Sequence, residues 1–395
     1  MNLPHYIHTS ILSASPVPLS STHPSVHPSK LSYQTVEEMS KAILTAWPRS
    51  AMQSFTTSDG VGLRYFDSGV GEAEEGSEEG KGKPWLVMIH GFTGSSLVFQ
   101  RNIPSLTPYY RVIAPDLRGH GSSDKPTHGF HVSRLAADLQ ELIELLTFTE
   151  EEMKSRPKQE WHAIGGSLGC SILWCYASLF TTSPFKHMIF VDQSPLQNRA
   201  EDWDLTHCNR GMNSLSALLS LQQTLATDPE TAHRGTIEAC LAYRAFPLEN
   251  DFRTEEQRAK VMREDEVFFL GEAMKGRQEW FGKLMGDHTA LDWRGSIAAT
   301  FGPGSKSLSK TKVLVVASER SGCFPAEGPL FVVALVNGDS GETDGKGREG
   351  ERRAKGVSVG WGGHWCYWED PERFNRLCLD FLGDREMDGS LGRWV

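Results

Sequence analysis

Residues 161–170 of the chain read WHAIGGSLGC and contain a G-x-S-x-G pattern centred on Ser167. Residues 161–167 read as a buried strand that stops at the serine, and residues 168–180 read as the helix after it. A sharp strand-to-helix turn pushes a serine side chain out of a sheet, and small residues on either side relieve the crowding. With 38 glycines among 395 residues the pattern also arises by chance, so the rest of the chain must decide its meaning.

Apolar runs typical of buried parallel strands alternate with helical segments on both sides of this stretch. Residues 52–69 read as two short strands joined at Asp59-Gly60, a hairpin turn signal. The strands expected after them cover 85–90, 111–116, 161–167, 187–193 and 311–318, and residues 357–365 contain the last strand and the loop that follows it. The expected helices cover 95–103, 131–146, 168–180 and 326–336, and a last helix begins at Asp370-Pro371-Glu372. This alternation predicts an α/β fold with a doubly wound, mostly parallel sheet of eight strands.

The composition excludes several classes of function. Hydrophobic residues make up 39% and charged residues 23% of the chain, as in ordinary globular proteins. The net charge is −10 and no basic patch stands out, which argues against a nucleic-acid partner. No apolar run reaches the roughly 18 residues of a membrane span. The seven cysteines include no C-x-x-C, so we expect buried thiols and a cytoplasmic protein.

Several regions depart from the alternation of strands and helices. Residues 1–48 are rich in Ser, Pro and His and are expected to be a disordered tail. Residues 196–290 have helical texture and are expected to form a helical cap inserted into the core. Two charged, Gly-rich stretches, 71–83 and 338–356, read as loop insertions. The α/β core then consists of 49–195 and 291–395.

Four segments, in a fixed order, carry a resemblance to a known family. They are HGFTGSS (90–96), DLRGHGSSDKP (116–126), the turn at Ser167, and GGHWCYWEDPERF (362–374). Together they make the chain resemble the α/β-hydrolase family, in the form that has a serine nucleophile and a cap domain. The resemblance covers about 52–195 and 296–385, and the helical insert falls where the family places its cap.

The resemblance implies roles for particular residues. Ser167 would be the nucleophile, and His364, on the loop after the last strand, would be the base that takes its proton. The backbone N–H groups of Phe92 and Leu168 would form the oxyanion hole. Other polar residues of these motifs are expected to be structural: His90, His120 and Asp116 in turns, and His162 in the core or at its edge.

The third member of the triad departs from the family pattern. The position after the seventh strand that usually holds the acid is occupied by Ser321. Asp192, at the end of the sixth strand, is the first alternative, because some family members carry the acid there. Glu319, two residues before Ser321, is the second, and a site without an acid is the third. The acid has to hold the far nitrogen of the histidine and fix its tautomer.

These residues together predict a serine hydrolase that cleaves a carboxylic ester or thioester of a small-to-medium apolar molecule through an acyl-enzyme. A carbon–carbon bond hydrolase, a lactonase and an acyltransferase can use the same triad. A catalytically degenerate ligand-binding protein would follow if no acid reaches His364. A dehalogenase or an epoxide hydrolase would need aspartate in place of Ser167.

The sequence contains no metal-ligand spacing and no phosphate-binding loop, so no cofactor or metal is expected. The aromatic residues of the insert could close an apolar pocket over the site, or could simply belong to the core. These residues are Trp203, Phe246, Phe268, Phe269, Trp280 and Phe281. The oligomeric state and the physiological substrate do not follow from the sequence.

Overall fold

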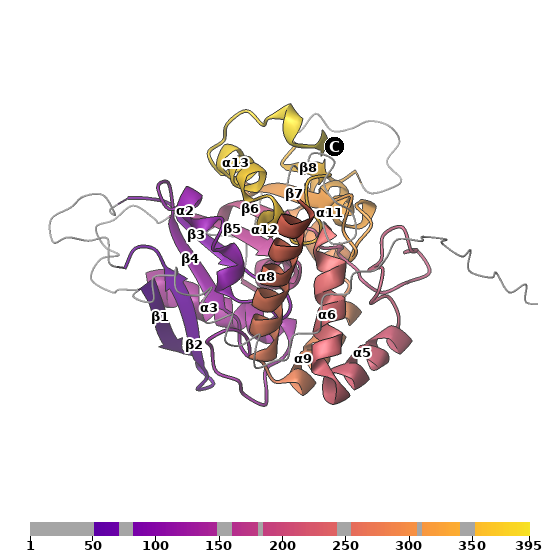
Figure 1. The fold of residues 1–395 in the computed structure, drawn as a ribbon. Coiled ribbons are helices and arrows are strands. Elements are labelled where there is room, and N and C mark those ends of the chain that lie inside the picture. Colours follow the sequence, from indigo (N-terminus) through magenta and orange to yellow (C-terminus); the bar gives the residue numbers. More distant parts are fainter. Residues whose placement is uncertain are drawn as a thin grey trace, which may run out of the picture.

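The structure, a computed structural model, describes seven segments of the chain: 51–70, 82–147, 160–180, 185–242, 254–305, 310–339 and 352–395. The expected tail over 1–48 lies outside these residues, as do Phe246 and most of the two Gly-rich insertions. The described segments form one sheet with helices on both of its faces (Figure 1).

The sheet has the strand order β1-β2-β4-β3-β5-β6-β7-β8-β9. The six strands from β4 to β8 in this order are parallel, and β1, β2 and β9 are antiparallel to their neighbours. The doubly wound, mostly parallel sheet is therefore confirmed. The strands are β1 (Met52–Thr56), β2 (Gly62–Asp67), β3 (Trp85–Ile89), β4 (Arg111–Asp116), β5 (Trp161–Gly166), β6 (Phe185–Val191), β7 (Lys312–Ser318), β8 (Ala354–Val359) and β9 (Arg393–Trp394).

Two details differ from the sequence prediction. The ninth strand, β9, has only two residues, which is too short to leave a periodic pattern. The single helix expected over 95–103 is instead a 3₁₀ helix, η4 (Ser96–Phe99), followed by the short α2 (Ile103–Leu106). Pro104 explains the break, because proline has no N–H to continue a helix and fits best in a first turn.

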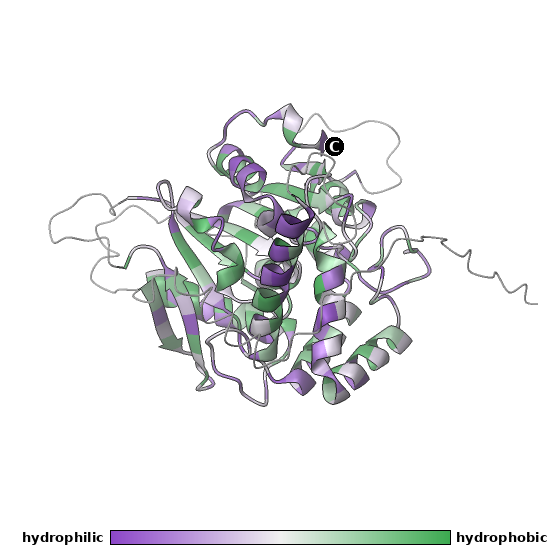
Figure 2. Ribbon diagram, viewed as in Figure 1, coloured by the Kyte–Doolittle hydropathy of each residue, from purple (hydrophilic) through white to green (hydrophobic). Residues whose placement is uncertain are grey.

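Alternate strand residues face two apolar cores, one on each side of the sheet. Val87 and Ile89 face the first core, and Leu86 and Met88 face the second. Figure 2 shows the strands as a largely hydrophobic centre between helices of mixed character. The first core is covered by α3 (Val132–Thr147), α4 (Leu168–Phe180), α10 (Arg294–Phe301) and α11 (Glu327–Asn337). The second is covered by η4, α2, α12 (Cys366–Glu369) and α13 (Pro371–Leu382).

Between β6 and α10, the described residues form four helices that gather beside the sheet (Figure 1). Helix α5 packs against α6 and α9, and α6 packs against α8. A capping box at Thr254 and Gln257 begins α8, which satisfies two of its otherwise unpaired N–H groups. The four helices are α5 (Leu215–Thr227), α6 (Pro229–Cys240), α8 (Glu255–Met274) and α9 (Gln278–Ala290).

Aromatic stacking anchors α8 to the core. The ring of Phe269 stacks on Trp365 with centroids 4.0 Å apart, and Phe268 stacks on Trp368 at 4.6 Å. Offset aromatic pairs of this kind add about 0.5–1.5 kcal/mol beyond the area they bury. Trp365 directly follows His364, so this packing also fixes the loop that carries the histidine. Within the described segments, no helix combines the length and the apolar character that crossing a bilayer requires.

A buried guanidinium ties the turn after β4 to the neighbouring elements. Arg118 is fully buried and binds both oxygens of Asp59 at 2.8 Å and both oxygens of Asp138 at 2.7 and 2.9 Å. The hydrogen bonds from Arg118 hold the pKa of Asp59 well below its usual range. The segment DLRGHGSS therefore supplies a structural ion pair as well as a turn.

Replacement of this arginine should destabilise the fold without touching the cavity. We expect Arg118→Met to lower the free energy of unfolding by about 3 kcal/mol, the lower end for a broken buried ion pair. The loss in the free energy of unfolding should lie at the lower end because Arg134 still pairs with Asp138 at 2.7 Å. Urea denaturation would measure the loss. Arg376→Met is the control, since its side chain is 63% exposed and the change should stay within about 0.5 kcal/mol. Equal losses in both variants would contradict the assignment.

Candidate active site

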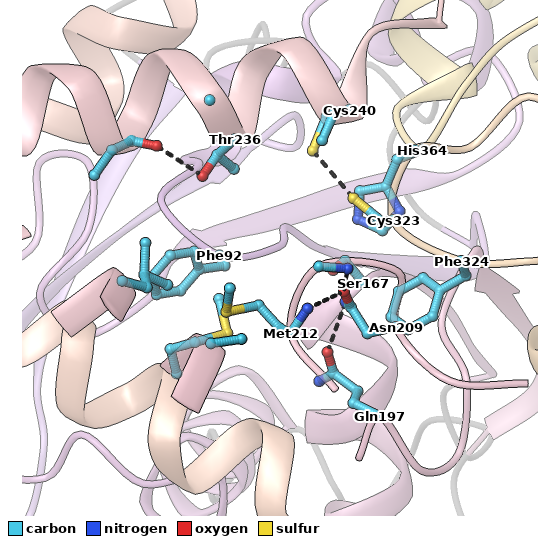
Figure 3. Close-up of a pocket in the computed structure, with 18 of the residues that line it drawn as sticks. Phe92, Ser167, Gln197, Asn209, Met212, Thr236, Cys240, Cys323, Phe324 and His364 are labelled. Carbon is cyan, nitrogen blue, oxygen red and sulfur yellow. Dashed lines mark hydrogen bonds between the residues drawn. The ribbon is translucent and has the colours of Figure 1, made fainter. Parts of the chain in front are cut away.

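The loops after β3, β5, β6, β7 and β8 meet at one edge of the sheet, because the carboxyl ends of parallel strands lie together. A cavity of about 500 Å³ lies at this edge, within the usual size range of small-molecule sites. Phe92, Ser167 and His364 line it from the core, and Leu221 and Thr236 line it from α5 and α6. Figure 3 shows these core residues facing the same space.

Ser167 occupies a strained turn between β5 and α4. Its φ angle is 53°, in the left-handed region that residues with a side chain rarely adopt. A Cβ added to Gly169 would come within 2.3 Å of the carbonyl oxygen of Ile89, and one added to Gly165 within 2.7 Å of the carbonyl carbon of Gly169. The two outer glycines of the G-x-S-x-G pattern are therefore required by the close approach of three chain segments.

Two backbone N–H groups near Ser167 are free to bind an anion. Within the described segments, neither Phe92 nor Leu168 donates its N–H to a backbone or side-chain acceptor. Leu168 begins α4, so its N–H is one of the first-turn donors that a helix leaves unpaired. A Cβ on Gly91 would lie 3.1 Å from Cβ of Ser167, which places the loop before Phe92 directly beside the serine. This arrangement has the donors that an oxyanion hole needs.

The structure brings Asp192 and His364 together. Nδ1 of His364 lies 2.7 Å from Oδ2 of Asp192, and both side chains are buried. The other carboxylate oxygen, Oδ1, accepts the N–H of Ser318 at 2.9 Å. Asp192 itself has a φ angle of 48°, a strained conformation that aspartate tolerates better than most residues. The carboxylate is therefore held rigidly from two sides.

The other acid candidate points elsewhere. Oε1 of Glu319 accepts a hydrogen bond from Oγ of Ser358 at 2.7 Å and lies 3.5 Å from Nε of Arg393. Its side chain is 48% exposed, whereas His364 is buried. Ser321, at the family's usual acid position, accepts the N–H groups of Cys323 and Phe324, both at 3.1 Å. It thus shapes the loop after β7 instead of contacting the histidine.

Gln193 is a neighbour of the serine that the sequence pattern did not single out. Oγ of Ser167 donates to Oε1 of Gln193 at 3.4 Å, which is at the long end for a hydrogen bond. Nε2 of Gln193 donates to the carbonyl oxygen of Ser194 at 2.9 Å. Catalytic hydrogen bonds are often loose in the absence of substrate, so the serine hydroxyl remains available for another partner.

Two cysteines from separate segments lie beside His364. Sγ of Cys240 and Sγ of Cys323 are 3.6 Å apart, and both lie within 4.8 Å of a ring nitrogen of His364. The hydrogen bond from Cys240 lowers the pKa of Cys323, against an opposing effect of burial. Burial alone lowers the pKa of His364, but the contacts with Cys323 and Asp192 outweigh it and raise that pKa. No local sequence pattern marks this pair, because the two cysteines are 83 positions apart in the chain.

The remaining candidate residues are held in structural contacts. Nε2 of His90 accepts the N–H of Leu117 at 3.0 Å, and Asp116 accepts the N–H groups of Ser96 and Ser122, both at 2.7 Å. His162 is buried, and its Nδ1 lies 3.1 Å from Nδ1 of His187. Nδ1 of His120 lies 2.9 Å from the carbonyl oxygen of Arg118.

The wall of the cavity is mainly apolar, with a few polar groups. Met285 and Ala232 contribute apolar surface. His288 also lines the cavity, and its Nδ1 has no hydrogen-bond partner within the described segments. Burial lowers the pKa of His288 to about 3, so the ring is neutral. Of the two readings of the insert's aromatic residues, the described ones fit the second: they do not line the cavity, and Trp280, for example, stacks on Phe130.

Comparison with known proteins adds a family match. A family model described as the alpha/beta hydrolase fold matches residues 84–371. A curated relative, the soluble epoxide hydrolase of Corynebacterium sp. (strain C12), is 44% identical over 69 residues. Those residues are 18% of this chain and 24% of the relative, so the match spans about a quarter of that protein.

Solved structures agree with the sheet described above. An esterase from Exiguobacterium antarcticum aligns with a TM-score of 0.62 and 16% identity, covering 84% of this chain and 99% of its own. A bromoperoxidase from Bacillus anthracis aligns with a TM-score of 0.61 and 18% identity, covering 84% of this chain and 100% of its own. At such identities the likeness is one of fold, and the chemistry has to be argued from the site.

Proposed function

Because the chain belongs to the alpha/beta hydrolase family, we propose that it is a serine hydrolase that cleaves a carboxylic ester or thioester of a small-to-medium apolar substrate. The nucleophile is Ser167, the base is His364 and the acid is Asp192. The N–H groups of Phe92 and Leu168 bind the oxyanion. The helices within 196–290 serve as the cap that closes the cavity and selects the substrate.

The contact between Asp192 and His364 carries this proposal. At 2.7 Å, the carboxylate can hold a proton on Nδ1 and leave Nε2 to work as the base. A site that had lost its function would have no need to keep a buried aspartate in a strained conformation against a histidine. The contact therefore favours an enzyme over a ligand-binding protein built on the same fold.

Each residue of the site has its own role in the two steps of the reaction. In the form in which His364 is deprotonated, Ser167 Oγ attacks the acyl carbon and Nε2 of His364 accepts the hydroxyl proton. The two N–H groups stabilise the negative charge that develops on the carbonyl oxygen. His364 then protonates the leaving alcohol or thiol, which departs and leaves the acyl group on Ser167. The same imidazole activates a water molecule, and its attack releases the acid and restores the serine.

The cavity supports an apolar substrate of limited size. Leu221 and Met285 line the same cavity as the serine, and they suit a hydrocarbon acyl group. His288 also lines the cavity, and its ring is neutral because burial lowers its pKa. Epoxide opening of the kind named for the curated relative would need a carboxylate nucleophile, and this chain has Ser167 there.

A fluorophosphonate probe tests the proposal directly. Such a probe phosphonylates only a serine that a working base activates, so we expect one equivalent of label on the folded protein and none after heat denaturation. A panel of p-nitrophenyl esters of increasing acyl length should then show turnover with an optimum set by the cavity. Styrene oxide is the control substrate and should not be consumed. An unlabelled folded protein that turns over no ester would refute the proposal.

A further inference from the structure

The cluster of Cys240, Cys323 and His364 has a chemistry that the triad does not use. Two cysteine sulfurs and a histidine nitrogen form a ligand set that zinc and similar metals prefer. The three ligand atoms lie within 4.8 Å of one another, and all three residues line the cavity. Figure 3 shows the two sulfurs side by side next to the imidazole.

The spacing of the sulfurs fits a tetrahedral metal site. With zinc–sulfur bonds of about 2.3 Å, two sulfurs on one tetrahedral ion are about 3.8 Å apart. The sulfurs of Cys240 and Cys323 are already 3.6 Å apart. Two thiolates and a neutral imidazole would also balance the two positive charges of the ion. The two sulfurs would therefore have to move apart by only about 0.2 Å.

Backbone contacts hold the three ligand segments against each other. The N–H of Gly322 donates to the carbonyl oxygen of Ala239 at 3.1 Å, and the N–H of Trp365 donates to that of Cys240 at 3.3 Å. A Cβ on Gly322 would come within 2.4 Å of the oxygen of Ala239, and one on Gly363 within 2.7 Å of the oxygen of Cys240. The end of α6 thus touches both loops directly, so the ligands need little ordering on binding.

The histidine is also prepared for a metal. A metal-binding histidine usually gives its other nitrogen to a carboxylate, which fixes the ring and makes the ligand more basic. Asp192 makes this contact with Nδ1 of His364 at 2.7 Å. Nε2 is then the nitrogen left to face the sulfurs and the cavity. Asp192 would therefore orient His364 both for catalysis and for metal binding.

We propose that Cys240, Cys323 and His364 bind a thiophilic divalent cation, for which Zn²⁺ is the probe, and that the bound ion inhibits the hydrolase by taking Nε2 of His364 away from Ser167. The fourth position of the ion faces the cavity and holds water. Binding displaces two protons from the two thiols and the imidazole to solvent and involves no change of oxidation state. The inhibitory part rests on the proposed function, whereas the binding part does not.

Cobalt spectroscopy tests the binding part on the full chain, reduced and freed of metal by a chelator. One equivalent of Co²⁺ should give a sulfur-to-cobalt charge-transfer band in the near ultraviolet, and Zn²⁺ should abolish it. We expect Cys240→Ala and Cys323→Ala each to weaken the band by half or more. Cys208→Ser is the matched control, because Cys208 is buried in the Leu196 and Trp203 cluster and its replacement should leave the band intact. Circular dichroism verifies that each variant is folded.

Ester hydrolysis tests the inhibitory part. Saturating Zn²⁺ should lower the turnover of the wild type at least tenfold, and the chelator should restore it. Cys323 is only half-buried in the native chain, so its replacement by alanine should be tolerated. In Cys323→Ala, the ratio of the hydrolysis rates without and with Zn²⁺ should fall close to one. A missing cobalt band, a band that survives both alanine variants, or full turnover at saturating Zn²⁺ would overturn the proposal. A normal cobalt titration with no hydrolysis of any ester would instead refute the proposed function.

Discussion

Ser167→Ala is expected to lower kcat/KM on the best p-nitrophenyl ester by about 10⁴- to 10⁶-fold, the range found when a serine nucleophile is removed. Fluorophosphonate labelling should disappear with it. Alanine can adopt the positive φ angle of residue 167 at modest cost, and among the described residues the hydroxyl has just one hydrogen-bond partner, Gln193 at 3.4 Å. The melting temperature should therefore stay close to that of the wild type.

Ser178→Ala is the matched control for this experiment. Ser178 belongs to the same helix, α4, but its side chain is exposed on the outer surface. Both kinetic constants and the labelling should be unchanged in this variant. Residual labelling of Ser167→Ala at the wild-type level would mean that another residue is the nucleophile, and peptide mapping of the label would then identify it.

Asp192→Asn is expected to reduce kcat by about 10⁴-fold with a smaller effect on KM, as the loss of the orienting carboxylate does in other triads. The amide oxygen can keep the bond from the N–H of Ser318 that Oδ1 now accepts. The amide NH₂ then faces Nδ1 of His364, which has to become an acceptor. The ring proton moves to Nε2, and the histidine can no longer take a proton from the serine.

Glu319→Gln separates this explanation from a general effect of lost charge. Glu319 bonds Ser358 and lies away from His364, so the variant should keep kcat within about twofold. A reversed result, with a large loss for Glu319→Gln and little for Asp192→Asn, would show that the acid has been wrongly assigned. Thermal melting of both variants would exclude unfolding as the cause.

Much of the fold could be predicted because the local patterns agree with the tertiary structure. The run WLVMIH is apolar on both faces and forms β3, and Leu135, Leu139 and Leu142 mark the buried side of α3. The Asp59-Gly60 signal forms the hairpin between β1 and β2. The two-residue strand β9 could not be predicted, because it forms only through pairing with β8 at Val357 and Ser358.

In the candidate site, too, some residues could be predicted from the sequence and others could not. Ser167 is marked by glycines whose spacing has a local steric cause, so its sequence context is informative. The choice between Asp192 and Glu319 depends on how two strand ends lie relative to the last loop, and neither candidate carries a local signal for that. Cys240 and Cys323 are 83 positions apart in the chain. Their contact arises only when α6 folds back onto the loop after β7.

The contacts of α6 also determine which helix lining the cavity can accept substitutions without disturbing the catalytic residues. Displacing the end of α6 would break its bonds with Gly322 and Trp365 and disturb the histidine loop. Of the residues in α5, all of which are described, only Leu225 is fully buried. We therefore expect α5 to be the gate through which substrates enter. Directed evolution aimed at its cavity-facing residues, such as Leu221, should change acyl-chain preference while leaving the reaction centre undisturbed.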